Sequence, residues 1–152
     1  MNIKTLVTTL CVASVFIVSL TGGTPAQEKE FLDKYKTAFE KGDKATLESF
    51  LYTKGANPMA LEFYKMMQSA EAGKGKITKI ELIDLTPEDV KKTSEVMEGP
   101  GGTKAKLPLK PIKKLKITVE MKDENGSTTS NNESYIAESG GKYVIPVPVD
   151  AK

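Results

Sequence analysis

The side chains of this sequence that are best suited to chemistry are phenols, hydroxyls, amides and carboxylates. Tyr35 lies in the apolar stripe of a predicted helix, where a buried phenol needs a hydrogen-bond partner and can donate its proton to a ligand oxygen. Ser130, Asn132 and Ser134 alternate along a predicted strand, so they share one face of it. The sequence therefore predicts these four residues as a ligand-binding site. The alternatives are plain core packing for Tyr35 and a solvent-exposed sheet edge for the other three.

The residue types that are missing exclude several functions. The chain has no His, Arg or Trp, and its one Cys is Cys11, near the start. Ser-His-Asp and Cys-His catalysis and zinc sites built on His or Cys are therefore excluded in their usual forms. Without Arg, bidentate recognition of phosphate or guanine is missing, so we expect no nucleic-acid partner. We predict no cofactor, no metal site and no catalytic residue.

An acid-base enzyme is the alternative to a non-catalytic module. Such an enzyme would use Tyr35 as the proton donor to a carbonyl substrate and would need a carboxylate within hydrogen-bond distance of the same cavity. The candidate carboxylates are Asp33, Glu62 and Asp84.

The first part of the chain has the pattern of an export signal. Lys4 precedes an uncharged apolar run from Leu6 to Leu20, which is shorter than the roughly 20 residues that cross a bilayer as a helix. Thr24-Pro25-Ala26 then offers the small residues that a signal peptidase reads. The sequence predicts a signal peptide over residues 1–26 and a single α+β domain over residues 27–152. We expect a secreted or periplasmic protein with no stable membrane anchor.

Hydrophobic spacing and capping residues indicate helices in the first half of this domain and strands in the second half. The predicted helices cover residues 28–41, 44–52 and 58–72, with a short fourth helix from Pro87 towards Met97. The predicted strands cover residues 76–85, with a bulge, then 114–122, the segment through Ser130 to Ile136, and 142–149. Residues up to Pro111 after the fourth helix are predicted as a loop, and Pro146 and Pro148 indicate that the last strand is an edge strand, at least near its end.

Two clusters allow both a structural and a binding interpretation. Met59, Phe63, Met66 and Met67 on the third predicted helix are predicted to fill the core, with a soft binding surface as the alternative. Six lysines are predicted to keep a loop and a sheet edge solvated, with an anionic membrane surface as the alternative. They are Lys104, Lys106, Lys110, Lys113, Lys114 and Lys116.

Two segments resemble the nuclear transport factor 2-like superfamily. The run Tyr35-Lys-Thr-Ala-Phe-Glu-Lys-Gly42-Asp43, followed by a second short helix, is similar to the opening of that superfamily, and Gly140-Gly141-Lys142-Tyr143-Val144-Ile145 is similar to its last strand. The resemblance implies an exported bacterial member with N-terminal helices packed on a curved antiparallel sheet. This cystatin-like cone often has a pocket at its open end.

The resemblance also implies what an enzyme of this class would need. In the ketosteroid isomerase-like branch, a helix tyrosine at the place of Tyr35 donates to the oxyanion. Where that branch has an aspartate base before a proline, this chain has Asn57 before Pro58. An amide does not accept a proton as a general base does.

The function predicted from the sequence is thus an exported, non-catalytic module that binds a small apolar or amphipathic ligand or another protein. A homodimer through the open sheet is a further predicted partner. The alternative is an acid-base enzyme of the ketosteroid isomerase-like type that uses Tyr35.

Overall fold

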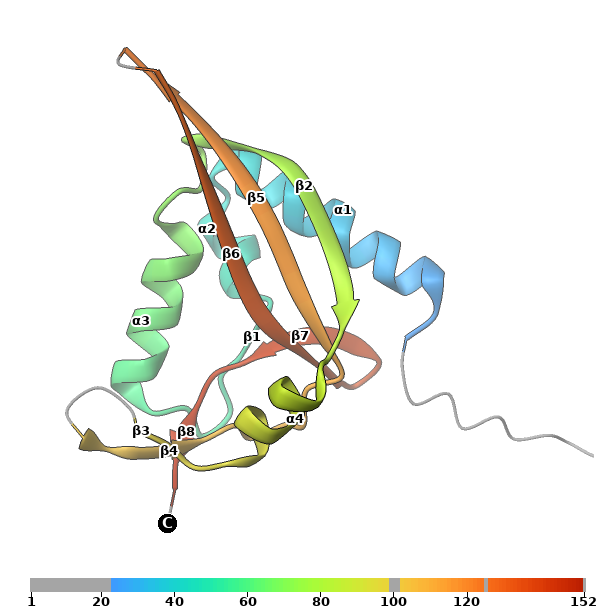
Figure 1. Cartoon of the computed structure of the whole chain (residues 1–152), viewed down its shortest axis with the longest axis vertical. Helices are drawn as coiled ribbons and strands as arrows, with labels where there is room; N and C mark the ends of the chain where they lie inside the picture. Colours follow the sequence, from blue (N-terminus) through green and yellow to red (C-terminus); the bar gives the residue numbers. More distant parts are fainter. Residues whose placement is uncertain (1–22, 99–101, 125, 152) are drawn as a thin grey trace, which may run out of the picture.

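The computed structural model describes residues 23–98, 102–124 and 126–151 (Figure 1). Within these ranges, four helices and eight strands form an α+β fold, as the order of elements predicted. The predicted signal peptide falls mostly on residues 1–22, which lie outside the described residues. No described helix is long and apolar enough to cross a membrane.

Helix α1 (Pro25–Lys41) is the main helix of the core. Thr24 and Gln27 form a capping box at its start, and Gly42 ends it with a φ angle of 68°, a left-handed conformation that glycine adopts readily. Its buried stripe packs on the sheet. The helix begins upstream of Gln27, the first residue after the predicted cleavage site. The buried residues of the stripe are Phe31, Tyr35, Ala38 and Phe39.

Helix α2 (Lys44–Glu48) is shorter than predicted, because the chain leaves it to join the sheet. Strand β1 (Leu51–Tyr52) pairs in parallel with β7 (Lys142–Pro146). The amides of Ile145 and Val147 donate to the carbonyl oxygens of Phe50 and Tyr52 at 2.7 and 3.2 Å. These bonds and the burial of Leu51 favour a strand where the helical spacing predicted about one more turn of helix.

The large sheet has the strand order β1-β7-β6-β5-β2, and every pair except β1 with β7 is antiparallel. Its long strands are β2 (Gly75–Asp84), β5 (Lys113–Asp123) and β6 (Gly126–Ser139). Leu115, Ile117 and Val119 pair with Ser134, Asn132 and Ser130. The predicted sharing of one sheet face by these two sets is therefore confirmed.

Two details of the sheet differ from the prediction. The bulge in β2 lies between Ile77 and Lys79, earlier than the slip in the sequence pattern indicated. Strand β7 lies between β6 and β1 and is not an edge strand, whereas Val149, at the end of the predicted strand, belongs to an edge strand of a second, small sheet. Pro146 is tolerated there because the amides that donate to β1 are those of Ile145 and Val147, and the pairing of β7 with β6 on the other side ends at Val144.

A small second sheet lies at the end of the molecule opposite the β5–β6 hairpin, near the short helix α4 (Pro87–Ser94) (Figure 1). It consists of β3 (Met97–Glu98), β4 (Lys104–Lys106) and β8 (Val149–Asp150). The fourth helix thus ends before Met97, and part of the predicted loop is a strand. The turn-forming residues nearby predicted a loop. A strand forms at β4 instead, because this segment pairs with β8.

Helix α3 (Pro58–Ser69) lies beside the large sheet, on the side of β6 that is away from β5 (Figure 1). Asn57 caps it by accepting a hydrogen bond from the Ala60 amide at 3.0 Å, and Pro58 occupies its first turn, as predicted. The main core lies between α1, α2 and the sheet, where Leu47, Ile77, Leu115 and Ile136 are fully buried. Helix α3 lies opposite the sheet, and a cavity lies between them.

Candidate functional site

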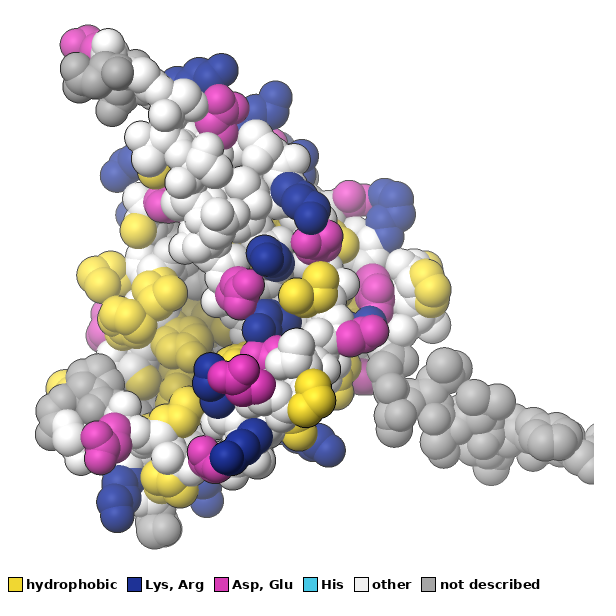
Figure 2. All heavy atoms as spheres, in the orientation of Figure 1, with side chains coloured by type: hydrophobic (Ala, Val, Ile, Leu, Met, Phe, Trp, Pro, Cys, Tyr) yellow, Lys and Arg dark blue, Asp and Glu magenta, His cyan; other side chains and the backbone are white. Residues whose placement is uncertain are grey.

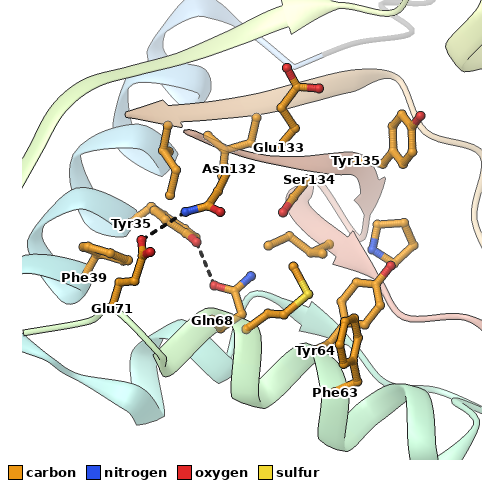
Figure 3. Close-up of a pocket in the computed structure, with 15 residues that line it drawn as sticks. Tyr35, Phe39, Phe63, Tyr64, Gln68, Glu71, Asn132, Glu133, Ser134 and Tyr135 are labelled. Carbon is orange, nitrogen blue, oxygen red and sulfur yellow. Dashed lines mark hydrogen bonds between the residues drawn. The ribbon is translucent and has the colours of Figure 1, made fainter. Parts of the chain in front are cut away.

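A cavity of about 270 Å³ lies between α3, α1 and strands β5 to β7 (Figure 3). Three of the four predicted site residues, Tyr35, Asn132 and Ser134, line it, and Ser130 does not. The alternation of side chains along β6 points Asn132 and Ser134 inward, and the apolar stripe of α1 brings Tyr35 to the same space. Most of the wall is apolar. It includes Phe39, Phe63, Tyr64, Met67, Leu115, Ile117, Ile145 and Pro146.

Tyr35 is held at the inner end of the cavity by a hydrogen bond between α1 and α3. Its hydroxyl donates to Oε1 of Gln68 at 2.7 Å, and its ring packs against Phe31 and Phe50. Burial raises the pKa of the Tyr35 hydroxyl well above its usual value, and the bond to Gln68 offsets only part of that rise. The phenol therefore keeps its proton at neutral pH, and Gln68 receives it as a hydrogen bond.

Gln68 is the central polar residue that the sequence reasoning missed. Its side chain is 6% exposed, and Nε2 points into the cavity with no hydrogen-bond partner among the described residues (Figure 3). Among the described residues, no fully buried side-chain nitrogen or oxygen lacks a hydrogen-bond partner, so Gln68 Nε2 is in contact with the open space of the cavity, where it can donate to an acceptor atom. The signal in the sequence is the spacing of Leu61, Tyr64 and Gln68, which places them on one face of α3.

Glu71, just after α3, supplies the negative charge that faces the cavity. Its Oε2 accepts hydrogen bonds from Ser130 Oγ at 2.8 Å and from Asn132 Nδ2 at 3.1 Å. Ser130 thus positions Glu71 without lining the cavity itself. Glu133, the other charged residue of the lining, points away from the cavity (Figure 3) and forms ion pairs with Lys114 and Lys116. No described lysine forms an ion pair with Glu71, so its charge is not compensated.

Two hydroxyl groups complete the polar part of the site. Ser134 Oγ points into the cavity, and no described residue forms a hydrogen bond with it (Figure 3). Tyr64 lies on the α3 side, where burial and the nearby Tyr135 raise the pKa of its hydroxyl. Both hydroxyls stay neutral near pH 7 and are able to donate or accept a hydrogen bond.

The carboxylates predicted for an enzyme lie elsewhere. The side chains of Asp33, Glu62 and Asp84 are 66, 76 and 89% exposed, and none of them lines the cavity. They form ion pairs with Lys29, Lys65 and Lys113, respectively.

Asn57 is also absent from the cavity wall. It caps α3, and its Nδ2 donates to Asp150 at 2.5 Å. The structure therefore gives Asn57 a role in placing α3.

The prediction that the methionine-rich row of α3 fills the core is wrong. Met59, Phe63, Met66 and Met67 are 51, 46, 59 and 50% exposed. Helix α3 directs Ala60 and Gln68 inward and packs Leu61 and Tyr64 against the core, so the four side chains of the methionine-rich row face solvent or the mouth of the cavity. Figure 2 shows hydrophobic side chains gathered beside an apolar hollow at this place. We call these four residues the α3 apolar row.

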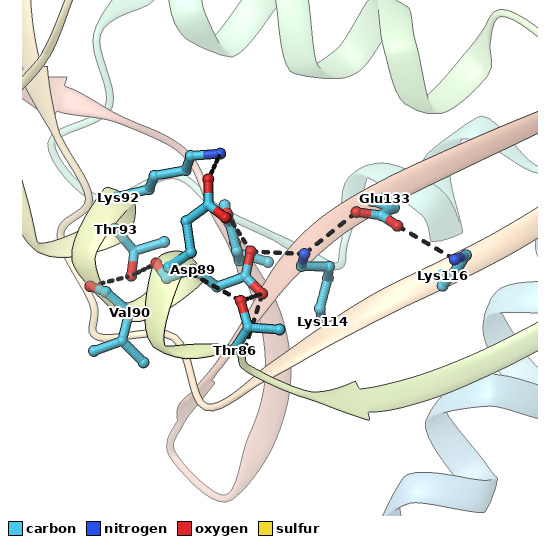
Figure 4. A network of polar contacts seen from close by, with 10 residues as sticks. Thr86, Asp89, Val90, Lys92, Thr93, Lys114, Lys116 and Glu133 are labelled. Atoms are coloured by element: carbon cyan, nitrogen blue, oxygen red, sulfur yellow. Dashed lines mark hydrogen bonds and ion pairs between the residues drawn. The ribbon is translucent and has the colours of Figure 1, made fainter.

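A second polar network lies on the outer face of the sheet, beside α4 (Figure 4). Asp89 is 6% exposed, forms an ion pair with Lys114 at 2.7 Å and accepts hydrogen bonds from Thr86 and Tyr135. The bond from Lys114, followed by those from Thr86, holds the pKa of Asp89 well below its usual value. This network fixes α4 to β5 and β6. Its lysines form ion pairs with Asp89, Glu133 and Glu88, so the network has a structural role.

No known protein family and no curated protein matches this chain. Two solved structures are similar to it at low sequence identity. One is the helical cell shape determining protein Pgp2 from Campylobacter jejuni, with 15% identity and a TM-score of 0.43, covering 77% of this chain and 37% of that protein. The other is Rv3472, a protein of unknown function from Mycobacterium tuberculosis, with 10% identity and a TM-score of 0.41, covering 83% of this chain and 69% of that protein.

Proposed function

We propose that this chain is an exported, non-catalytic binding module, and that its cavity takes a small apolar or amphipathic ligand that is neutral or cationic. The observation that supports this proposal is the side chain of Gln68, whose oxygen accepts from Tyr35 while its amide nitrogen faces the open space of a largely apolar cavity. Pockets for small molecules typically combine such a wall with a few convergent polar groups.

The polar groups of the cavity indicate how the ligand is oriented. A ligand oxygen is expected to accept from Gln68 Nε2 and from Ser134, while a ligand N–H or ammonium group faces Glu71. The apolar body of the ligand then packs on Phe39 and Tyr64. An anionic ligand is disfavoured, because within the described part of the chain no lysine lines the cavity and none forms an ion pair with Glu71.

The enzyme alternative has no supporting observation in this geometry. Asp33, Glu62 and Asp84 lie outside the cavity, and the Tyr35 proton is already donated to Gln68. Glu71 faces the cavity, but one of its oxygens already accepts two hydrogen bonds. The site is thus better suited to binding than to moving a proton.

Three small probes test the ligand class: benzyl alcohol, benzylamine and benzoate. In a nitrogen-edited NMR titration, we expect the side-chain amide signal of Gln68 to shift with benzylamine and benzyl alcohol, and benzoate to bind at least about tenfold more weakly. Ser134→Leu fills the cavity and should abolish these shifts, while Thr129→Leu on the exposed part of β6 should leave them unchanged. Equal shifts in both variants would contradict the proposed site.

Native mass spectrometry of the purified protein adds a test that assumes no ligand. A bound small molecule that is lost in Ser134→Leu and kept in Thr129→Leu would support the proposal. The same measurement gives the mass of the assembly, which decides whether the predicted homodimer through the sheet forms.

A further inference from the structure

One edge of the large sheet is open beside the cavity. Strand β7 pairs with β6 only over Ala137–Ser139, while β5 pairs with β6 over Gly126–Ile136 on its other side. From Gly126 to Ile136, β6 therefore has no neighbouring strand on the cavity side among the described residues. In an antiparallel strand, alternate residues direct their N–H and C=O groups away from the partner. This segment thus presents a row of main-chain donors and acceptors.

The sequence of this edge contains few of the features that proteins use to prevent edge pairing. Such features include proline, lysine and short strand length. Residues 127–134 contain no proline and no lysine, and Glu133 is their one charged residue. The opposite edge, β2, carries Lys76 and Lys79. The two long edges of the sheet are therefore protected to different degrees.

Helix α3 forms the opposite wall of a groove along this edge. The cavity is lined by Phe63 and Met67 from α3 and by Asn132 to Tyr135 from β6, so it opens between the two elements. Figure 2 shows the α3 apolar row on one side of the hollow. A groove between a strand edge and an apolar helix is an arrangement in which an extended peptide is bound as an added strand, with alternate side chains in pockets.

We propose that this groove binds an extended segment of another protein, which pairs with residues 127–134 of β6 and places one apolar side chain in the cavity. This proposal rests on the proposed function, because it uses the same cavity and names the molecule that delivers the ligand group. The cavity of about 270 Å³ is below the roughly 300–1,000 Å³ typical of drug-sized ligands, so it suits one large side chain.

Charge and sequence specify the occupant further. The uncompensated carboxylate of Glu71 favours a basic residue next to the apolar anchor. A second copy of this chain that pairs through the same edge does not meet the requirement, because residues 126–134 contain no apolar side chain to fill the cavity. The partner is thus a different polypeptide segment, extended, with an apolar residue flanked by a basic one.

A random peptide library displayed on phage, selected on the purified protein, tests this proposal. We expect the selected peptides to share an apolar anchor with an adjacent Lys or Arg. A synthetic copy of the best peptide should shift the backbone amide signals of residues 127–134 and leave those of β2 unchanged. Ser134→Leu should weaken its binding at least about tenfold, and Glu71→Gln should weaken it and reduce its salt dependence.

Backbone methylation distinguishes strand addition from simple docking of side chains. Two versions of the peptide, N-methylated at odd or at even positions, keep the same side chains but lose opposite sets of N–H donors. We expect one version to lose binding and the other to keep it. Loss of both or of neither would contradict strand pairing.

The outcomes separate the two proposals. A selection that returns no peptide, or peptides that are insensitive to Ser134→Leu, would overturn the peptide proposal. So would a homodimer that buries β6. If benzylamine still shifts the Gln68 amide in that case, the proposed function stands without the peptide. If neither benzylamine nor any peptide perturbs the cavity, both proposals are wrong.

Discussion

The hydrogen bond between Tyr35 and Gln68 connects α1 to α3 across the inner end of the cavity. Both side chains are buried, so neither water nor a neighbouring group easily replaces the lost partner when one of them is changed. The same pair leaves Gln68 Nε2 available to a ligand. One amide thus serves the fold through its oxygen and the site through its nitrogen.

Substituting Gln68 tests this double role. Gln68→Leu leaves the Tyr35 hydroxyl without an acceptor in a buried place, and we expect the free energy of unfolding to fall by about 1–3 kcal/mol. Adding Tyr35→Phe should recover part of this loss, because the unpaired hydroxyl is then removed. Urea denaturation of the two single variants and the double variant measures the coupling. Strictly additive losses would show that the hydrogen bond contributes nothing.

Asp89 predicts how the stability of the protein depends on pH. Because its pKa is lower in the folded state than in the unfolded chain, Asp89 contributes stability above the unfolded value of about 3.9, and this stability is lost as the pH falls below it. In Asp89→Asn we expect a lower melting temperature at pH 7 and a flatter decline between about pH 4 and pH 2. Asp33→Asn is the control, since its side chain is largely exposed. Parallel acid profiles of wild type and Asp89→Asn would contradict this assignment.

Individual site residues were predictable where local spacing determines their direction. Tyr35 follows from the stripe of α1, and Asn132 and Ser134 follow from strand alternation and register. Gln68 and Glu71 were missed, because their inward position depends on where α3 stands relative to β6. The α3 apolar row was assigned to the core for the same reason. Helical spacing shows which residues share a side, but not whether that side meets another element.

At the scale of elements, α3 decides whether the cavity exists. It contributes Phe63, Tyr64, Met67 and Gln68 to the lining, and Asn57 sets its start. The link from Asn57 to Asp150 ties that start to the small sheet. A change at Asn57 therefore acts on the site from outside it.

Two variants of Asn57 separate its two contacts. Asn57→Ala removes both the cap and the Asp150 bond, and we expect it to cost about 1–2 kcal/mol in the free energy of unfolding and to weaken benzylamine binding. Asn57→Ser keeps a capping oxygen and should lose less stability. Chemical denaturation and the NMR titration measure the two effects. If Asn57→Ala leaves benzylamine affinity unchanged, the placement of α3 by this residue does not matter for the site.

At the scale of the whole molecule, the α+β class followed from the order of helices and strands, because helices that precede a run of strands pack on one sheet. The short strands β1, β3 and β4 did not follow. Each has two or three residues and exists through a partner distant in sequence, as β1 does through β7. Local patterns contain no information on such pairings.

Removal of the predicted signal peptide is the prediction at this scale. We expect the mature protein to begin at Gln27, which intact-mass spectrometry of secreted or periplasmic material measures directly. Cleavage there removes Thr24, which caps α1 in the described structure. Thr24→Ala should therefore destabilise the unprocessed chain by about 1 kcal/mol and leave the processed protein unchanged. A mature protein that retains Thr24 would contradict the predicted cleavage site.

The placement of the aromatic residues gives the molecule a built-in optical reporter. The chain has five tyrosines and no tryptophan, and Tyr35, Tyr64 and Tyr135 all line the cavity. Tyrosine therefore dominates the intrinsic emission, and Tyr35 and Tyr64 lie where an occupant would quench or shield them. Occupancy is thus readable by fluorescence without a dye, while Tyr52 and Tyr143 supply a constant background.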